Sequence, residues 1–248
     1  MKVIGIIPAR YGSVRFPGKP LADIGGKTMI RRVYENSAEV LENIIVATDD
    51  RLIYDEVVSF GGKVVMTSAK HKSGTDRCAE ALKKYETAEN KVFDIVINIQ
   101  GDEPFLHKEH LQKLITCFDD SKTEIATLVK KININEDIFN PNKPKVVFDK
   151  NKKAIYFSRS AIPYLRNAEK KEWHLKHNYF KHIGIYAYRR DILKKITNLD
   201  ISGLEIAESL EQNRWIENGF KIKTDITDKE SISIDTPEDL ERLLKKLF

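Results

Sequence analysis

Three cations and two glycines follow the first apolar run of the chain. They lie in one loop, and the residues are Arg10, Gly12, Arg15, Gly18 and Lys19. Glycines let backbone N–H groups approach an anion closely, and cations neutralise its charge. The spacing is neither that of a Walker A loop nor that of a G-x-G-x-x-G loop. The residues therefore predict a phosphate-binding loop, with a solvated surface turn as the equal alternative.

Acidic side chains follow a later apolar run. Asp102 and Glu103 come just after the predicted strand Phe93–Ile99, and Gly101 permits a tight turn before them. Mg²⁺ usually takes one or two carboxylates together with phosphate oxygens and water. An acidic pair in a turn is by itself more often a cap or turn feature. Combined with the cationic loop, the pair favours a magnesium site.

A second candidate acid, Asp235, lies near the C-terminus. It follows a short alternating segment that reads as a strand, and it precedes Thr236 and Pro237, which suit the start of a helix. On spacing alone, Asp235 is better explained as part of that helix start than as a metal ligand.

Two further patterns have polar groups at element ends. The segment His71–Arg77 suits a nucleotide at a helix N-terminus, although capping of the helix by Ser73 or Thr75 is the stronger explanation from the residues alone. Arg159 follows an aromatic strand and can bind a carboxylate through two parallel hydrogen bonds, with a solvated strand end as the equal alternative. His182 is more typical of a structural histidine.

The elements that must position these residues are predicted best in the first half. Short apolar runs alternate there with amphipathic segments, which is typical of βαβ units and a mostly parallel sheet with helices on both faces. Ligands of such α/β sheets bind beyond the carboxyl ends of the strands. The predicted strands are Lys2–Ile7, Asn43–Thr48, Lys63–Thr67 and Phe93–Ile99, and the predicted helices are Thr28–Leu41, Arg51–Phe60 and Thr75–Tyr85.

The second half is less regular. We expect a long loop over Pro163–Asn178 and one helix over Leu204–Asn218 that ends at Gly219. The predicted strands are Glu124–Ile132, Lys145–Asp149, Ala154–Arg159, Phe180–Tyr188 and Lys221–Asp225.

Composition excludes several classes of protein. The 248 residues are 41% hydrophobic and 32% charged, as expected of a soluble protein, and the net charge of +5 is spread along the chain. No basic tail or basic helix stands out, so we expect no nucleic-acid partner, and no apolar stretch is long enough to cross a membrane. The beginning of the chain does not resemble a signal peptide. Cys78 and Cys117 lack metal spacing and are predicted to be reduced thiols of a cytoplasmic protein rather than a disulfide.

Nine segments in order resemble the CMP-Kdo synthetases, the 3-deoxy-manno-octulosonate cytidylyltransferases. Each segment alone is weakly or moderately specific, but nine in order are highly specific. They are Pro8–Leu21, Ala47–Asp49, His71–Arg77, Asn98–Pro104, Tyr156–Arg159, His182–Tyr186, Leu204–Glu205, Leu210–Gln212 and Asp235–Leu240. One departure is Asn213, where relatives often have leucine, and another is the number of lysines in the loop Pro163–Asn178.

The resemblance implies the reaction of CTP with Kdo (3-deoxy-manno-octulosonate) to give CMP-Kdo and pyrophosphate, for lipopolysaccharide synthesis. It also implies a nucleotide-diphospho-sugar transferase fold, Mg²⁺ as cofactor and a homodimer in the cytoplasm. We expect a single domain, 1–248, softly divided into a nucleotide-binding half, 1–134, and a sugar-binding and dimerisation half, 135–248.

Residue roles follow from the resemblance alone. The triphosphate would be bound by Arg10, Arg15 and Lys19, and Ser13 of the same loop would also contact the nucleotide. The cytidine would be bound by Ala9, Ser73, Gly74 and Arg77, with Gln100 between nucleotide and sugar. Mg²⁺ would be bound by Asp102 and Asp235. The sugar pocket would be lined by Arg159, His182, Tyr186, Glu211 and Gln212.

Three alternatives stay open. The nearest is a nucleotidyltransferase for another acidic sugar, such as 8-amino-Kdo or a sialic acid. The others are a glycosyltransferase that consumes a nucleotide sugar and a nucleotide-binding module without activity, and the crowded cationic loop and the two acids argue against these.

Overall fold

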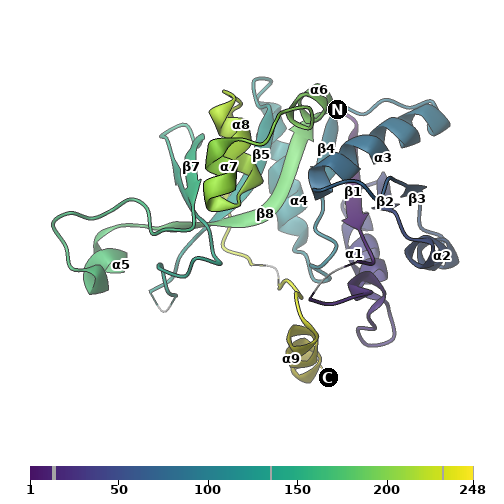
Figure 1. The fold of residues 1–248 in the computed structure, drawn as a ribbon, viewed down its shortest axis with the longest axis horizontal. Helices are drawn as coiled ribbons and strands as arrows, with labels where there is room; N and C mark the ends of the chain where they lie inside the picture. The colour runs from purple at the N-terminus through teal and green to yellow at the C-terminus, as the bar shows by residue number, and fades with distance from the viewer. Residues whose placement is uncertain (13–14, 135, 231, 248) are drawn as a thin grey trace. The chain divides into compact units, whose positions relative to one another are not determined.

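The computed structural model describes residues 1–12, 15–134, 136–230 and 232–247 and contains two compact units (Figure 1). Unit 1 comprises Met1–Gln112 with Ser231–Phe248, and unit 2 comprises Lys113–Glu230. The C-terminal segment thus belongs with unit 1, whereas the sequence suggested a subdivision after residue 134. The physical reason is burial, because Ile234 and Leu243 pack into one apolar cluster with Ile24 and Met29.

Unit 1 contains four parallel strands in the order β3, β2, β1, β4. The buried apolar runs of β1, β2 and β4, such as Ile4, Ile6 and Ile7 in β1, are expected of a sheet covered on both faces, whereas the edge strand β3 is only partly buried. The strands are β1 (Val3–Ala9), β2 (Ile44–Thr48), β3 (Val64–Met66) and β4 (Ile95–Asn98).

The helices of unit 1 start at side-chain caps that the sequence supplies. Thr28, Asp50 and Ser73 each accept hydrogen bonds from backbone N–H groups of the first helical turn that follows them. Both α1 and α3 pack against β1 (Figure 1). The helices are η1 (Lys19–Leu21, a short 3₁₀ turn), α1 (Met29–Ala38), α2 (Arg51–Ser59), α3 (Gly74–Glu89) and α9 (Pro237–Leu247), and α4 (Lys108–Thr116) runs across the boundary between the units.

Unit 2 is built on β5, which pairs in parallel with β9 and antiparallel with β8. The strands β6 and β7 form an antiparallel pair, and β6 meets β8 where Lys145 lies opposite Lys181. The strands are β5 (Ile125–Lys131), β6 (Lys145–Phe148), β7 (Ala154–Ser158), β8 (Phe180–Arg189) and β9 (Ile222–Ile226). The helices are η2 (Cys117–Asp119), η3 (Lys170–Glu172), α5 (Trp173–Lys176), α6 (Arg190–Ile196), α7 (Gly203–Glu208) and α8 (Glu211–Glu217).

The expected α/β class with a mostly parallel sheet is confirmed, and three details were wrong. The single helix over Leu204–Asn218 is two helices, because Ser209 has a left-handed backbone (φ 50°) that ends α7. The expected loop Pro163–Asn178 contains η3 and α5. The strand expected directly before Asp235 is absent from the described residues 232–234. Both cysteines are free and buried, and none of the described helices is long and apolar enough to cross a membrane.

Candidate active site

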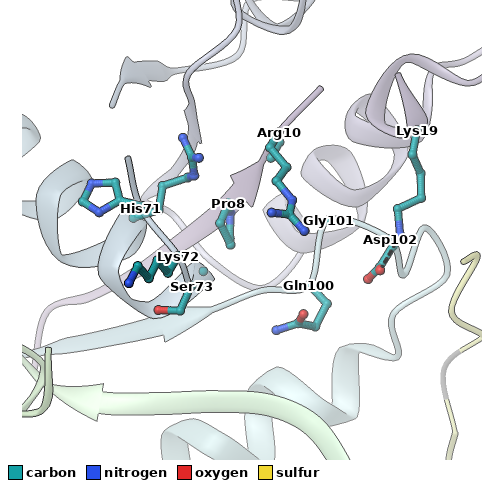
Figure 2. A pocket seen from close by; sticks show the side chains of 12 residues that line it. Pro8, Arg10, Lys19, His71, Lys72, Ser73, Gln100, Gly101 and Asp102 are labelled. Carbon is teal, nitrogen blue, oxygen red and sulfur yellow. Dashed lines mark hydrogen bonds and ion pairs between the residues drawn. The ribbon is translucent and has the colours of Figure 1, made fainter. Parts of the chain in front are cut away.

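An open pocket of about 250 Å³ lies at the carboxyl ends of β1 and β4 in unit 1. Figure 2 shows His71, Lys72 and Ser73 at one end of it and Lys19 with Asp102 at the other. Its lining comprises Pro8, Ala9, Arg10, Lys19, His71, Lys72, Ser73, Gly74, Arg77, Gln100, Gly101 and Asp102. Eight residues expected to bind nucleotide or metal are therefore together at one site.

Two glycines let three chain segments meet at this pocket. A Cβ on Gly101 would lie 3.0 Å from the carbonyl oxygen of Pro8, and a Cβ on Gly74 would lie 3.3 Å from Cγ of Pro8. The turn after β4 and the start of α3 can therefore both lie close to the end of β1. The N-terminal N–H groups of α3 and their positive partial charge lie at the same place.

The Lys19 ammonium lies between two acids that are far apart in sequence. Its Nζ is 2.7 Å from Oδ2 of Asp102 and 3.5 Å from Oδ1 of Asp235, and Arg15 is 3.0 Å from the same Asp235 oxygen. The backbone fixes this approach, because the N–H of Ile234 donates to the carbonyl of Asp102 at 3.0 Å. The two predicted metal ligands are thus neighbours in the structure.

The start of α9 does not use the Asp235 carboxylate. Asp239 accepts hydrogen bonds from the backbone N–H groups of Asp235 and Thr236, and the Thr236 hydroxyl accepts one from the N–H of Asp239. This reciprocal pair satisfies the helix start. The Asp235 side chain is instead directed to Lys19 and Arg15, an arrangement that helix capping alone does not explain.

Ser73 and Arg77 have structural partners at the pocket. The Ser73 hydroxyl accepts a hydrogen bond from the N–H of Asp76 and caps α3, as the alternative explanation predicted. The buried guanidinium of Arg77 donates to Thr67 at 2.7 Å and to Asp49 at 2.9 Å. Their expected contacts with cytidine, like that of Gln100 with the sugar, stay predictions.

Arg10 differs from these residues. It follows β1, is exposed, and makes no hydrogen bond or ion pair within the described part of the chain. Its charge is therefore available to an anion in the pocket. Ser13, expected to contact the nucleotide, lies outside the described residues.

Sequence reasoning missed two side chains that line the pocket, His71 and Lys72. Glu80 of α3 fixes the imidazole, because it contacts Nε2 of His71. Burial raises the pKa of Glu80, but hydrogen bonds from Lys84, Ser68 and His71 outweigh it and lower this pKa to about 2. The signal was present, since both residues belong to the segment His71–Arg77.

All five predicted sugar-binding residues belong to unit 2. His182 and Tyr186 of β8 have ring centroids 5.1 Å apart, and Tyr186 meets Trp215 of α8 edge-on. Burial lowers the pKa of His182 to about 3 and raises that of Tyr186, to which the charge of nearby Glu211 also contributes. Gln212, the fourth, is buried on α8.

Arg159, the fifth, directly follows β7, and its side chain donates hydrogen bonds to three backbone carbonyl oxygens. Glu211 pairs with Arg214 at 2.8 Å. Arg159 donates to the carbonyls of Glu208, Pro141 and Ser209. These sugar-pocket assignments stay predictions.

Cations, acids and a helix N-terminus at the carboxyl edge of a parallel sheet define an α/β protein that binds phosphorylated nucleotides. The family model described as cytidylyltransferase matches residues 4–226. Two curated relatives named 3-deoxy-manno-octulosonate cytidylyltransferase are each 58% identical: one from Parabacteroides distasonis, covering 98% of this chain and 97% of the relative, and one from Bacteroides thetaiotaomicron, covering 97% and 96%. The chain belongs to the 3-deoxy-manno-octulosonate cytidylyltransferase family.

A solved structure agrees with this assignment. It is described as CMP:2-keto-3-deoxy-manno-octonic acid synthetase complexed with CTP, and it is 43% identical with a TM-score of 0.89 over 100% of this chain and 98% of the other. A cytidylyltransferase from Leptospira borgpetersenii shares the fold at 20% identity and a TM-score of 0.61, covering 98% of this chain and 85% of the other.

Proposed function

We propose that this chain transfers a cytidylyl group from CTP to Kdo, giving CMP-Kdo and pyrophosphate. The observation that carries the proposal is one pocket that combines Arg10, Lys19, the N-terminus of α3 and Asp102. Two curated relatives are named as cytidylyltransferases of 3-deoxy-manno-octulosonate, and the similar solved structure is described as a complex with CTP; both support the proposal.

The two ends of the pocket suit the two parts of CTP. Arg10, Arg15 and Lys19 provide the cations for the triphosphate. The opposite end contains Ala9 together with Ser73 and Gly74 at the start of α3, and we assign it to the nucleoside. Arg77 supports that end through its buried hydrogen bonds to Thr67 and Asp49.

We further propose that Asp102 and Asp235 bind Mg²⁺. Two observations indicate that these residues suit the ion. Carboxylates are the hard oxygen donors that Mg²⁺ prefers. The two carboxylates also lie on either side of one position, which the positively charged ammonium of Lys19 occupies. When bound, the ion would supply Lewis-acid activation and charge neutralisation at the phosphates. No group of three or more His, Cys, Asp or Glu side chains suited to a metal is present among the described residues, so the nucleotide and water would complete the ligand set.

The mechanism follows from charge. The anomeric hydroxyl oxygen of the sugar attacks the α-phosphorus of CTP. The bond between the α-phosphorus and the oxygen that bridges it to the β-phosphate breaks, and pyrophosphate leaves. The hydroxyl proton passes to solvent. Both substrates are anions, so Arg10, Arg15 and Lys19 offset their repulsion and the charge that develops on the leaving group. His182 is not suited to accept this proton near neutral pH, because burial lowers the pKa of its imidazole to about 3 and so makes it a weak base.

Kdo would be bound by Arg159, His182, Tyr186, Glu211 and Gln212 of unit 2. Arg159 is the cationic member and would bind the sugar carboxylate. His182 and Tyr186 would present buried polar groups whose hydrogen bonds distinguish one sugar from another.

We also propose a homodimer in the cytoplasm, acting in lipopolysaccharide synthesis. Two buried cysteines, both free, suit a reducing compartment. Light scattering at micromolar protein tests the dimer, and a monomer mass would contradict it.

The nearest alternative is a cytidylyltransferase for 8-amino-Kdo or a sialic acid. Pyrophosphate release with CTP and each sugar in turn separates these. We expect turnover with Kdo, and we expect UTP, ATP and GTP to be poor replacements for CTP. Faster turnover with another sugar at equal concentration would reassign the substrate.

A further inference from the structure

The Arg159 guanidinium is fixed by backbone carbonyls of three residues. Nε donates to the carbonyl of Glu208 at 2.6 Å, Nη2 to that of Ser209 at 3.3 Å and Nη1 to that of Pro141 at 3.0 Å. A guanidinium has five N–H groups, so two remain for a ligand. The three hydrogen bonds hold the guanidinium in one orientation.

The Glu208 carboxylate holds the backbone from which Arg159 projects. It accepts hydrogen bonds from the N–H of Arg159 at 2.8 Å, from the hydroxyl of Ser158 at 2.6 Å and from the hydroxyl of Tyr156 at 3.3 Å. These bonds lower the pKa of Glu208 against the opposing effect of burial. Tyr156 and Ser158, which the proposed reaction does not use, thus serve to fix Glu208 against Arg159.

Lys145 holds the other side of the same residue. Its side chain is fully buried, and Nζ donates to the carbonyls of Arg159 at 2.6 Å and Asn140 at 2.8 Å. No carboxylate lies within ion-pair distance of it in the described ranges, and burial lowers its pKa. A buried ammonium without an ion pair is costly. The Lys145 ammonium holds the backbone of Arg159 and that of Asn140. Asn140 directly precedes Pro141, whose carbonyl accepts a hydrogen bond from the Arg159 guanidinium.

We propose that Glu208 and Lys145 are positioning residues for the substrate carboxylate: they hold Arg159 so that its two remaining N–H groups meet the carboxylate of the acidic sugar. The inference rests on the proposed function, in which Arg159 binds that carboxylate. Neither Glu208 nor Lys145 touches the sugar, and both act through Arg159.

The test is a set of double-variant cycles on the full chain, read as separate Michaelis constants for sugar and CTP. The variants are Glu208→Gln, Lys145→Met and Arg159→Ala, alone and in pairs with Arg159→Ala. Glu208→Gln and Lys145→Met should each raise KM for Kdo by about fivefold or more, and Arg159→Ala by about tenfold to a hundredfold, with KM for CTP nearly unchanged. In the Arg159→Ala background, neither second change should raise KM for Kdo further.

Glu124→Gln is the matched control. Glu124 also accepts a hydrogen bond from a backbone N–H of unit 2, that of Lys221 at 3.0 Å, but it is not a hydrogen-bond partner of Arg159. Both Michaelis constants of this variant should therefore stay at the wild-type values. If Glu208→Gln fails to fold, Ser158→Ala removes only the 2.6 Å hydroxyl contact to Glu208 and should raise KM for Kdo in the same direction.

Three results would overturn the inference. One is an unchanged KM for Kdo in the Glu208 and Lys145 variants, and another is an equal rise in KM for both substrates. The third is an undiminished effect of either change in the Arg159→Ala background. Wild-type turnover separates this failure from that of the proposed function: if wild type uses no acidic sugar, the proposed function fails and the inference falls with it.

Discussion

The ammonium of Lys19 lies 2.7 Å from Oδ2 of Asp102 and also reaches Asp235, at 3.5 Å. The site that we assign to Mg²⁺ therefore already attracts a positive charge supplied by the chain. Lys19 is also one of the three cations that we assign to the triphosphate. The Lys19 ammonium and a metal ion cannot both occupy the position between Asp102 and Asp235. We therefore expect Lys19 and the ion to compete for these carboxylates.

Replacing Lys19 by Met tests this competition. Without nucleotide, Mn²⁺ binding measured by electron paramagnetic resonance should become tighter, because the competing ammonium is gone. The variant should raise KM for CTP by about tenfold or more, since a charge-assisted contact with phosphate is lost. Manganese binding no tighter than in the wild type would show that Lys19 does not occupy the metal position.

Asp235 and Asp239 form a matched pair of acids at one helix start. Asp235→Asn should lower turnover by about a hundredfold or more, because several kcal/mol of transition-state stabilisation disappear, and should leave the melting temperature near the wild-type value. Asp239→Ala should instead leave turnover near the wild-type value and lower the melting temperature, because it removes the acceptor of two backbone N–H groups. The expected loss of stability is about 0.5–2 kcal/mol.

Turnover and thermal melting of both variants decide whether Asp235 binds the metal or only helps to start α9. Normal turnover and early melting of Asp235→Asn would return Asp235 to a helix-start role. The same comparison with Asp102→Asn should give a loss of turnover similar to that of Asp235→Asn.

The first half of the fold was predictable because its signals are local. The strands β1, β2 and β4 of unit 1 are mostly buried apolar runs. Thr28, Asp50 and Ser73 mark the starts of the helices. The residues of the pocket could be expected at strand ends, since parallel strands share one carboxyl edge.

The rest depends on contacts between residues far apart in sequence. Asp235 is placed by one hydrogen bond from Ile234 to Asp102 and by the apolar cluster around Ile24, which no local pattern records. Ser209 breaks the expected helix with a left-handed backbone, although serine has no special preference for it. Arg159 shows the same limit, because its partners Pro141 and Glu208 come from distant segments.

Burial of His182 predicts a dependence of stability on pH. The unfolded chain binds a proton on this histidine below about pH 6.5, whereas the folded chain binds it only near pH 3. Falling pH therefore favours unfolding, and stability should be lost from about pH 6.5 downward by at most about 1.4 kcal/mol per pH unit. The carboxylates with lowered pKa values, such as Glu80 and Glu136, add to this loss only near and below their ordinary value of 4.5.

His182→Gln isolates this effect. Urea unfolding between about pH 7 and pH 5 should show a shallower loss of stability in the variant than in the wild type. Parallel pH profiles for the two proteins would mean that His182 takes up its proton equally well when folded.

The central claim is that this chain joins CTP to Kdo, and pyrophosphate release by the purified protein tests it most directly. With CTP, Kdo and Mg²⁺ together, we predict one pyrophosphate and one CMP-Kdo for each CTP consumed, no release when either substrate is omitted, and loss of activity with EDTA that added Mg²⁺ restores. A folded protein that releases no pyrophosphate with both substrates and Mg²⁺ present would contradict the proposed function.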